Sequence, residues 1–193
     1  RQFESVGMTP ADITTYDDYL RFPITTKQNI RDNADAFISD EYVRDQLITA
    51  KTGGSTGVSL HLFFEKDCEE RRNAAALMSD QWSGWKLGMK KAAIWGNPPV
   101  AKTLKQKIRA TFLDRCIFLD TMRLDDQSMG EFVDRWRVEF PQAIFGHSHS
   151  IYILARYLDE KGVNDIRPKS IVSTSMMLLQ HERELIEKVF QCP

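Results

Sequence analysis

The fold is decided by one stretch early in the chain, Lys-Thr-Gly-Gly-Ser-Thr-Gly-Val-Ser-Leu at residues 51–60. Apolar segments stand on both sides of it, at residues 46–50 and 60–64. Because Gly, Ser and Thr separate two short apolar runs, the pattern predicts a strand, a loop and a second strand. Glycines allow positive φ and the close approach of a ligand, and successive free N–H groups can form a nest for an anion. The loop is therefore either a plain hairpin turn or a phosphate-binding loop.

The loop differs from the two common phosphate-binding motifs. Val58 and Ser59 stand where the Walker loop has Lys and Ser or Thr, and a strand is predicted where the dinucleotide fingerprint opens a helix. Its order and spacing instead resemble the signature loop of the adenylate-forming (AMP-binding) ligases. The doubled glycine is similar to the phenylacetate–CoA ligase branch and, within it, to the capsular-polysaccharide (CapK-type) proteins. The resemblance implies that the β and γ phosphates of ATP lie on Thr52, Gly53, Gly54, Ser55, Thr56 and Gly57.

Composition narrows the class of protein. The 193 residues are 42% hydrophobic and 27% charged, with a net charge of −1, which is typical of a globular protein with a core. The mixed charge argues against nucleic-acid and membrane-surface partners. No apolar run approaches the ~20 residues of a membrane span, and no signal peptide opens the chain. Three widely spaced cysteines suit a reducing cytoplasm. Nothing in the composition argues against a homo-oligomer.

The rest of the chain alternates between helical and extended patterns. Helices are predicted at residues 10–20, 26–33, 67–82, 104–112, 128–140, 148–160 and 179–191, and strands at 91–96, 115–121, 143–146 and 170–175. Thr25 or Thr26, Asp67 and Ser128 are the expected N-caps, with Glu131 at capping-box spacing from Ser128, and the charged residues of the last helix are typical of a solvated face. This alternation predicts an α/β fold with a mostly parallel sheet and helices on both faces. We expect residues 1–45 to be a helical lead-in and residues 46–193 to be the nucleotide-binding core.

Ligands of open parallel sheets sit beyond the carboxyl ends of the strands, and two such ends are notable here. The first carries His147 and His149, each with a small residue on either side. Two imidazoles could form part of a metal site, which would fit a small metal-dependent hydrolase, although no third histidine is near in sequence. A second interpretation is that both histidines are ordinary, partly exposed residues at the start of a helix. The family resemblance implies a third, in which His147 and His149 line the substrate pocket.

The second strand end is Ser173-Thr174-Ser175, followed by Met176. In the family the matching turn contacts adenine and ribose, so the resemblance implies this role for Ser173, Thr174 and Ser175. The branch tends to carry a glutamate where Met176 stands, so a carboxylate role is absent there. Without the resemblance, these residues would be interpreted simply as small residues that connect a strand to a helix.

Taken with the resemblance, the sequence predicts an ATP-dependent ligase that joins a carboxylic acid to CoA or to another acceptor. No general base is nominated. The Mg²⁺ ligand of the family and its lid domain with a catalytic lysine are expected downstream of Pro193, so we expect this chain to be an inactive N-terminal part of a longer enzyme. The alternative is a binding or assembly module that kept the fold without the catalysis. Val58, which stands where the family loop often carries a lysine, and Met176 are the departures that suggest it.

Overall fold

The structure, a computed structural model, describes residues 2–52 and 59–192. These residues form two compact units, 1–72 and 73–193, which are described separately below. The predicted boundary between residues 45 and 46 concerns the organisation of a longer protein and stays a prediction.

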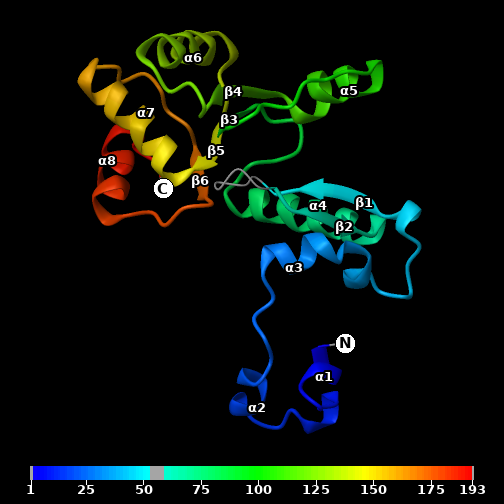
Figure 1. Ribbon diagram of the computed structural model, residues 1–193. Helices are drawn as coiled ribbons and strands as arrows, with labels where there is room; N and C mark the ends of the chain where they lie inside the picture. The colour runs from blue at the N-terminus through cyan, green and yellow to red at the C-terminus, as the bar shows by residue number, and fades with distance from the viewer. Residues whose placement is uncertain (1, 53–58, 193) are drawn as a thin grey trace. The chain divides into compact units, whose positions relative to one another are not determined.

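The first unit is a series of short helices followed by a hairpin. Its elements (Figure 1) are α1 (Gln2–Ser5), η1 (Pro10–Asp12), α2 (Tyr16–Leu20), α3 (Lys27–Asp32), η2 (Ala34–Phe37), η3 (Arg44–Gln46), β1 (Ile48–Lys51) and β2 (His61–Phe64). Strand β1 pairs antiparallel with β2, with Ile48 opposite Phe64 and Lys51 opposite His61. Helix α3 begins at a capping box in which Thr26 accepts from the N–H of Asn29, so the predicted N-cap is confirmed.

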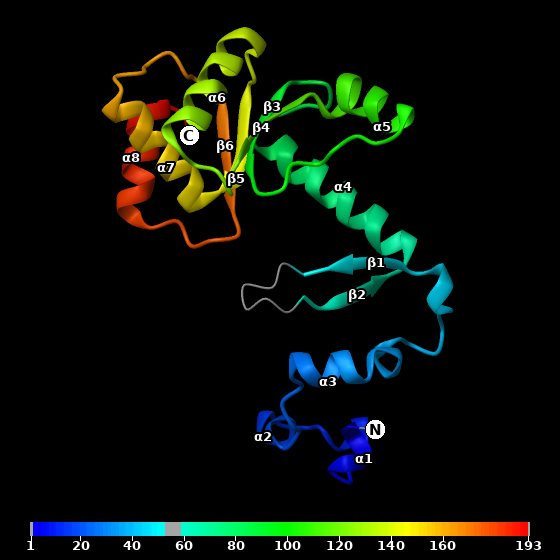
Figure 2. The same cartoon turned by 45° about the horizontal axis from the view of Figure 1, so that its top comes forward.

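The second unit is built on a parallel sheet of four strands. They are β3 (Lys91–Trp95), β4 (Cys116–Asp120), β5 (Ala143–His147) and β6 (Ser170–Thr174) (Figure 2), in the order β4-β3-β5-β6. The helices of the unit are α5 (Leu104–Arg109) with the π-helical turn η4 (Ala110–Asp114), α6 (Asp126–Glu139), α7 (Ser148–Glu160) and α8 (Gln180–Phe190). Helix α4 (Lys66–Trp82) starts in the first unit and ends in this one. The predicted α/β class and parallel sheet are confirmed.

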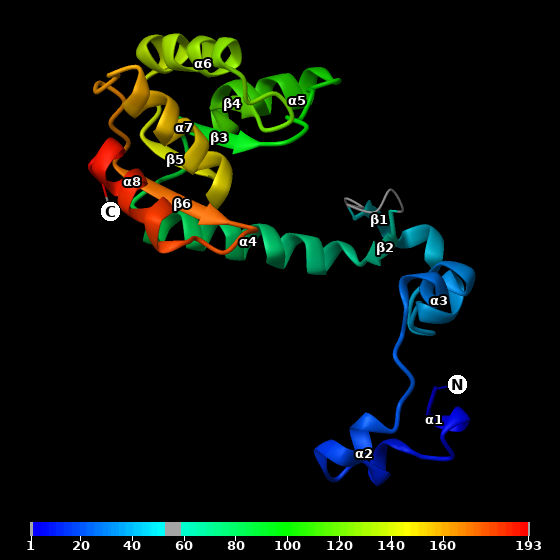
Figure 3. The same ribbon diagram turned by 60° about the vertical axis from the view of Figure 1, so that its left-hand side comes forward.

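The core of the second unit lies on one face of the sheet. Alternate strand residues such as Ile94, Ile117 and Ile144 are fully buried there, as the period of two along a strand requires. They pack against buried residues of α6 and α7, among them Phe132 and Leu154, and α8 packs on α7. Figure 3 shows α6 and α7 on one side of the strands and the last turns of α4 on the other.

The opposite face of the sheet is aromatic and only partly covered. Trp95 and Phe145 stack there with ring centroids 5.5 Å apart. The Nζ of Lys91 lies 2.8 Å from Asp80 of α4 and 4.6 Å from the centre of the Trp85 ring. With α4 and α5, this face encloses a hollow of about 560 Å³. Helices therefore contribute to both faces, as expected from the sequence.

Two local predictions are wrong. We expected Ser128 to cap α6 with Glu131 as its partner, but the N-cap is Asp125, whose carboxylate accepts from the N–H of Ser128 at 2.8 Å. We also expected Asp67 to cap α4, whereas the helix already begins at Lys66. In both places the sequence offers several polar residues within one turn, and the strand or loop before the helix decides which of them becomes the cap.

Candidate functional site

The hairpin brings together the two ends of the predicted phosphate loop. The N–H of Thr52 donates to the carbonyl of Leu60 at 2.9 Å, and the N–H of Leu60 donates to the hydroxyl oxygen of Thr52 at 3.0 Å. These bonds extend the β1–β2 ladder by one residue pair, and the side chain of Thr52 is part of them. The two predicted strands are therefore confirmed. Gly53, Gly54, Ser55, Thr56 and Gly57 lie outside the described residues.

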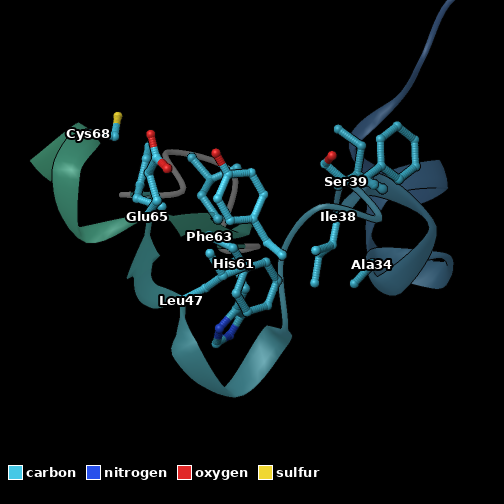
Figure 4. Close-up of a pocket in the computed structure, with 13 residues that line it drawn as sticks. Ala34, Ile38, Ser39, Leu47, His61, Phe63, Glu65 and Cys68 are labelled. Carbon is cyan, nitrogen blue, oxygen red and sulfur yellow. The ribbon is translucent and has the colours of Figure 1, made fainter.

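A pocket of about 370 Å³ lies beside this hairpin in the first unit. It is lined mainly by apolar side chains of α3, η2 and β2, and Figure 4 shows Glu65 and Cys68 on one side of it and Ala34 and Ile38 on the other. A hydrogen bond with Glu65 raises the pKa of Tyr42, which also lines the pocket. The sequence gave no signal for this pocket, because its walls come from segments up to 38 residues apart, from Ile30 to Cys68.

In the second unit, the strand order identifies where a ligand crevice belongs. The chain leaves β3 for β4 on one side and leaves β5 for β6 on the other, so the direction of the connections reverses between β3 and β5. Ligands of doubly wound sheets bind at the carboxyl ends of such neighbouring strands. The carboxyl ends here are Trp95 and His147.

Strands β3 and β5 approach closely at this crevice because Gly146 has no side chain. A Cβ at this position would lie 2.6 Å from the carbonyl oxygen of Ile94. The next residue, His147, packs its ring against Trp95, with centroids 4.1 Å apart. His147 therefore lies on the aromatic face of the sheet, together with Trp95 and Phe145.

His149 is directed elsewhere, although it is only two residues further along. It lies in the first turn of α7, and its Nδ1 is 2.6 Å from the carboxylate of Glu182 in α8. The two histidines thus have different partners. Among residues 2–52 and 59–192, no three or more His, Cys, Asp or Glu side chains are grouped as metal ligands, so the interpretation as a metal pair gains no support.

Glu182 is the site residue that sequence reasoning missed, since we took the charged residues of α8 for a solvated face. The residue is only 2% exposed. One carboxylate oxygen faces His149, and the other accepts from the N–H of Leu179 at 3.2 Å, which caps α8. The hydrogen bond with His149 lowers the pKa of Glu182, so the buried group is an ionised acceptor. Its position three residues after Leu179 is capping-box spacing, the signal that could have found it.

The structure brings the two predicted strand ends together. Strand β5 pairs with β6 so that His147 lies opposite Thr174 and Gly146 opposite Ser173. Ser175 then adopts a left-handed conformation with φ +70, which costs energy for a residue with a side chain and is often found at functional sites. The hydroxyl of Ser148 donates to the carbonyl of Met176 at 3.0 Å. Ser173, Thr174, Ser175 and His147 therefore share one edge of the sheet.

No protein-family model matches the chain. Among curated proteins, Protein CapK of Staphylococcus aureus is 27% identical over 178 residues, which cover 90% of this chain and 39% of CapK. No described helix is long and apolar enough to cross a membrane.

Solved structures of 2-hydroxyisobutyryl-CoA ligase align with the whole chain at a TM-score of 0.64. One is an open conformation in complex with 2-HIB-AMP and CoA, with 14% identity and 46% of that chain covered. Another is in the thioesterification state with the same two molecules, with 16% identity and 42% covered. The chain thus spans less than half the length of the proteins it matches. The resemblance predicted from the sequence is confirmed: the chain is similar to CapK along most of its length and has the α/β fold of an adenylate-forming ligase domain.

Proposed function

We propose that this chain is part of an ATP-dependent ligase that activates a carboxylic acid as an acyl-adenylate and passes the acyl group to CoA or another acceptor. The observation that carries the proposal is the similarity to CapK over 90% of the chain, joined to the fold of a CoA ligase. The reversal of the strand connections between β3 and β5 supports it, because the carboxyl ends of such strands are where an α/β sheet of this order binds ligands. A place in the cytoplasm and a link to capsular polysaccharide synthesis belong to the same proposal.

In the proposed reaction, a carboxylate oxygen of the acid attacks the α-phosphorus of ATP and pyrophosphate leaves. The acceptor then attacks the acyl carbonyl carbon, and AMP leaves with the bonding electron pair. Ser55, Thr56 and Gly57 would donate to the polyphosphate, with Thr52, Gly53 and Gly54 shaping the loop around it. Ser173, Thr174 and Ser175 would contact adenine and ribose. Such groups act mainly by holding the reactants in place and by compensating phosphate charge.

His147 and His149 were predicted together as substrate-pocket residues, and the structure gives them different settings. His147 borders the crevice beside Trp95, and Trp95 also lines the 560 Å³ hollow. Because that lining is mainly apolar, we expect an acid with an apolar body. Mg²⁺ accompanies the phosphates of ATP in such sites. Among the described residues, no three or more His, Cys, Asp or Glu side chains are grouped so that they could hold it.

The test is pyrophosphate release by the full-length protein with ATP, Mg²⁺ and a panel of aryl and aliphatic acids. We expect release with at least one acid, and a loss of roughly 100-fold in kcat/KM when Ser55 and Thr56 are both replaced by alanine. Thr49→Ala is the matched control, because Thr49 is an exposed hydroxyl residue of β1 outside the loop. No release with any acid would contradict the proposal and favour the alternative, a non-catalytic binding or assembly module.

A further inference from the structure

The turn between β6 and α8, residues 175–179, is held in place from the start of α7. Ser148 is 1% exposed and donates its hydroxyl to the carbonyl of Met176. The next residue, His149, bonds through Nδ1 to Glu182, and Glu182 accepts from the N–H of Leu179. We call Ser148, His149 and Glu182 the turn clamp. Its bonds fix both ends of the turn to one helix start.

The turn has little else to fix its shape. The side chains of Met176 and Met177 are 55% and 81% exposed, so they do not anchor the turn in the core. Ser175 is in a left-handed conformation, which is uncommon for a residue with a side chain. The backbone of the turn therefore depends on the turn clamp for its geometry.

The turn clamp is also more elaborate than a helix cap needs to be. Helix α6 is capped by Asp125, an exposed residue that bonds within its own turn. Helix α8 uses a carboxylate that is 2% exposed and reaches a half-exposed imidazole on another helix. Burial of an ionised carboxylate is costly unless its partners are fixed. Because Nδ1–H of His149 donates to this carboxylate, Glu182 is satisfied on both oxygens and the ring orientation is set.

We propose that His149 and Glu182 are positioning residues for the nucleotide: through the turn clamp they hold the backbone at residues 174–176 in the shape that binds adenine and ribose. The inference rests on the proposed function and adds residues to the same site. Glu182 does not take the place of the carboxylate that is lacking at Met176, because we do not expect Glu182 to contact the nucleotide. It acts on the turn through its hydrogen bonds with Leu179 and His149.

The experiment compares variants of the full-length protein in ATP–pyrophosphate exchange, with the acid that supports release. Glu182→Gln keeps the size of the side chain but leaves one carbonyl oxygen for two donors. We expect the KM for ATP to rise about 10-fold while kcat changes by less than about twofold, because ground-state and transition-state binding are lost together. His149→Asn keeps an N–H donor near the place of Nδ1, so it should retain a KM close to that of the unmodified protein, whereas His149→Ala should behave like Glu182→Gln.

The control is Glu187→Gln, which removes an exposed pair with Arg183 on the same helix, 2.7 Å long, away from the turn. Hydrogen exchange at Leu179 without nucleotide gives a second readout, and we expect it to be faster in Glu182→Gln and unchanged in Glu187→Gln. Should Glu182→Gln fail to fold, His149→Ala carries the test, since Glu182 then keeps its bond to Leu179.

The outcomes separate the inference from the function beneath it. If the unmodified protein exchanges pyrophosphate and Glu182→Gln has the same KM as Glu187→Gln, the inference is overturned and the proposed function stands. If the unmodified protein shows no exchange with any acid, the proposed function fails and the nucleotide role of the turn clamp fails with it. A raised KM in both Glu182→Gln and His149→Ala, with His149→Asn close to the unmodified protein, supports the inference.

Discussion

Gly146 determines how closely β5 can lie to β3 at the candidate crevice. A methyl group there would lie 2.6 Å from the carbonyl oxygen and 2.9 Å from the Cβ of Ile94. Both are part of a buried strand, and Ile94 itself is fully buried, so neither can move without shifting the sheet. We expect a side chain at Gly146 to be destabilising because it would lie too close to Ile94, and not because of an unusual backbone angle.

We therefore expect Gly146→Ala to lower the free energy of unfolding by about 1–3 kcal/mol or more, as overpacking in a tight core does. Urea denaturation of the 193-residue chain measures it. Gly130→Ala in α6 is the matched control, because its Cβ would meet only the hydroxyl end of Tyr157 at 3.3 Å and alanine favours a helix. Equal stability of the two variants would show that the strands are further apart than described.

At the scale of the elements, the start of α6 shows how a cap is chosen. Asp125 accepts from the N–H of Ser128, and Ser128 accepts from the N–H of Asp125 at 3.2 Å. Hydrogen bonds from the backbone and the side chain of Ser128 lower the pKa of Asp125, so its carboxylate is ionised at neutral pH and complements the positive end of the helix dipole. Glu131, the partner expected from the sequence, is bonded to Gln127 instead.

Asp125→Ala should lower the Tm of the chain by about 2–4 °C, because the first turn of α6 loses an acceptor. Glu131→Ala should leave the Tm within about 1 °C, since it removes only an exposed side-chain pair. Thermal unfolding followed by circular dichroism at neutral pH measures both. A larger decrease in Tm for Glu131→Ala than for Asp125→Ala would contradict the cap at Asp125 and favour the capping box of Ser128 and Glu131 expected from the sequence.

The elements themselves could be predicted because their signals are local. Strands β3 to β6 and helices α6 to α8 lie within a few residues of the predicted ranges, since apolar periodicity and small-residue boundaries act over one or two turns. The strand order and the Glu182–His149 pair could not be predicted, because both depend on contacts between segments that are distant in sequence. Glu182 and His149 are 33 residues apart. Burial of the apolar residues of α4 also depends on segments distant in sequence. The helix forms as predicted, but Trp82, whose type suggests a core position, is 78% exposed.

At the scale of the whole molecule, the two units differ in the core they contain. The hydrophobic core cluster lies entirely between Ala92 and Phe190. In residues 2–52 and 59–72, the buried hydrophobic residues are Met8 and Leu60. Since burial of apolar surface must offset the loss of chain entropy, the two units should differ in independent stability.

We expect residues 66–193, which keep α4 whole, to unfold in one cooperative thermal transition when expressed alone. Residues 1–72 alone should show no cooperative transition, because little apolar surface is buried in that unit. Circular dichroism melts of the two pieces, with the intact chain as control, check this. A sharp transition in the piece 1–72 would contradict the expectation, as would gradual melting of the piece 66–193.

The contact between Trp95 and His147 has one more consequence. Their ring centroids are 4.1 Å apart at the carboxyl ends of β3 and β5, and Phe145 also stacks with the indole of Trp95. An indole so close to an imidazole has an emission that depends on the charge and orientation of that ring. The chain thus carries an intrinsic optical reporter at the point where β3 and β5 end, and we expect a molecule that binds there to change the wavelength or intensity of the Trp95 fluorescence.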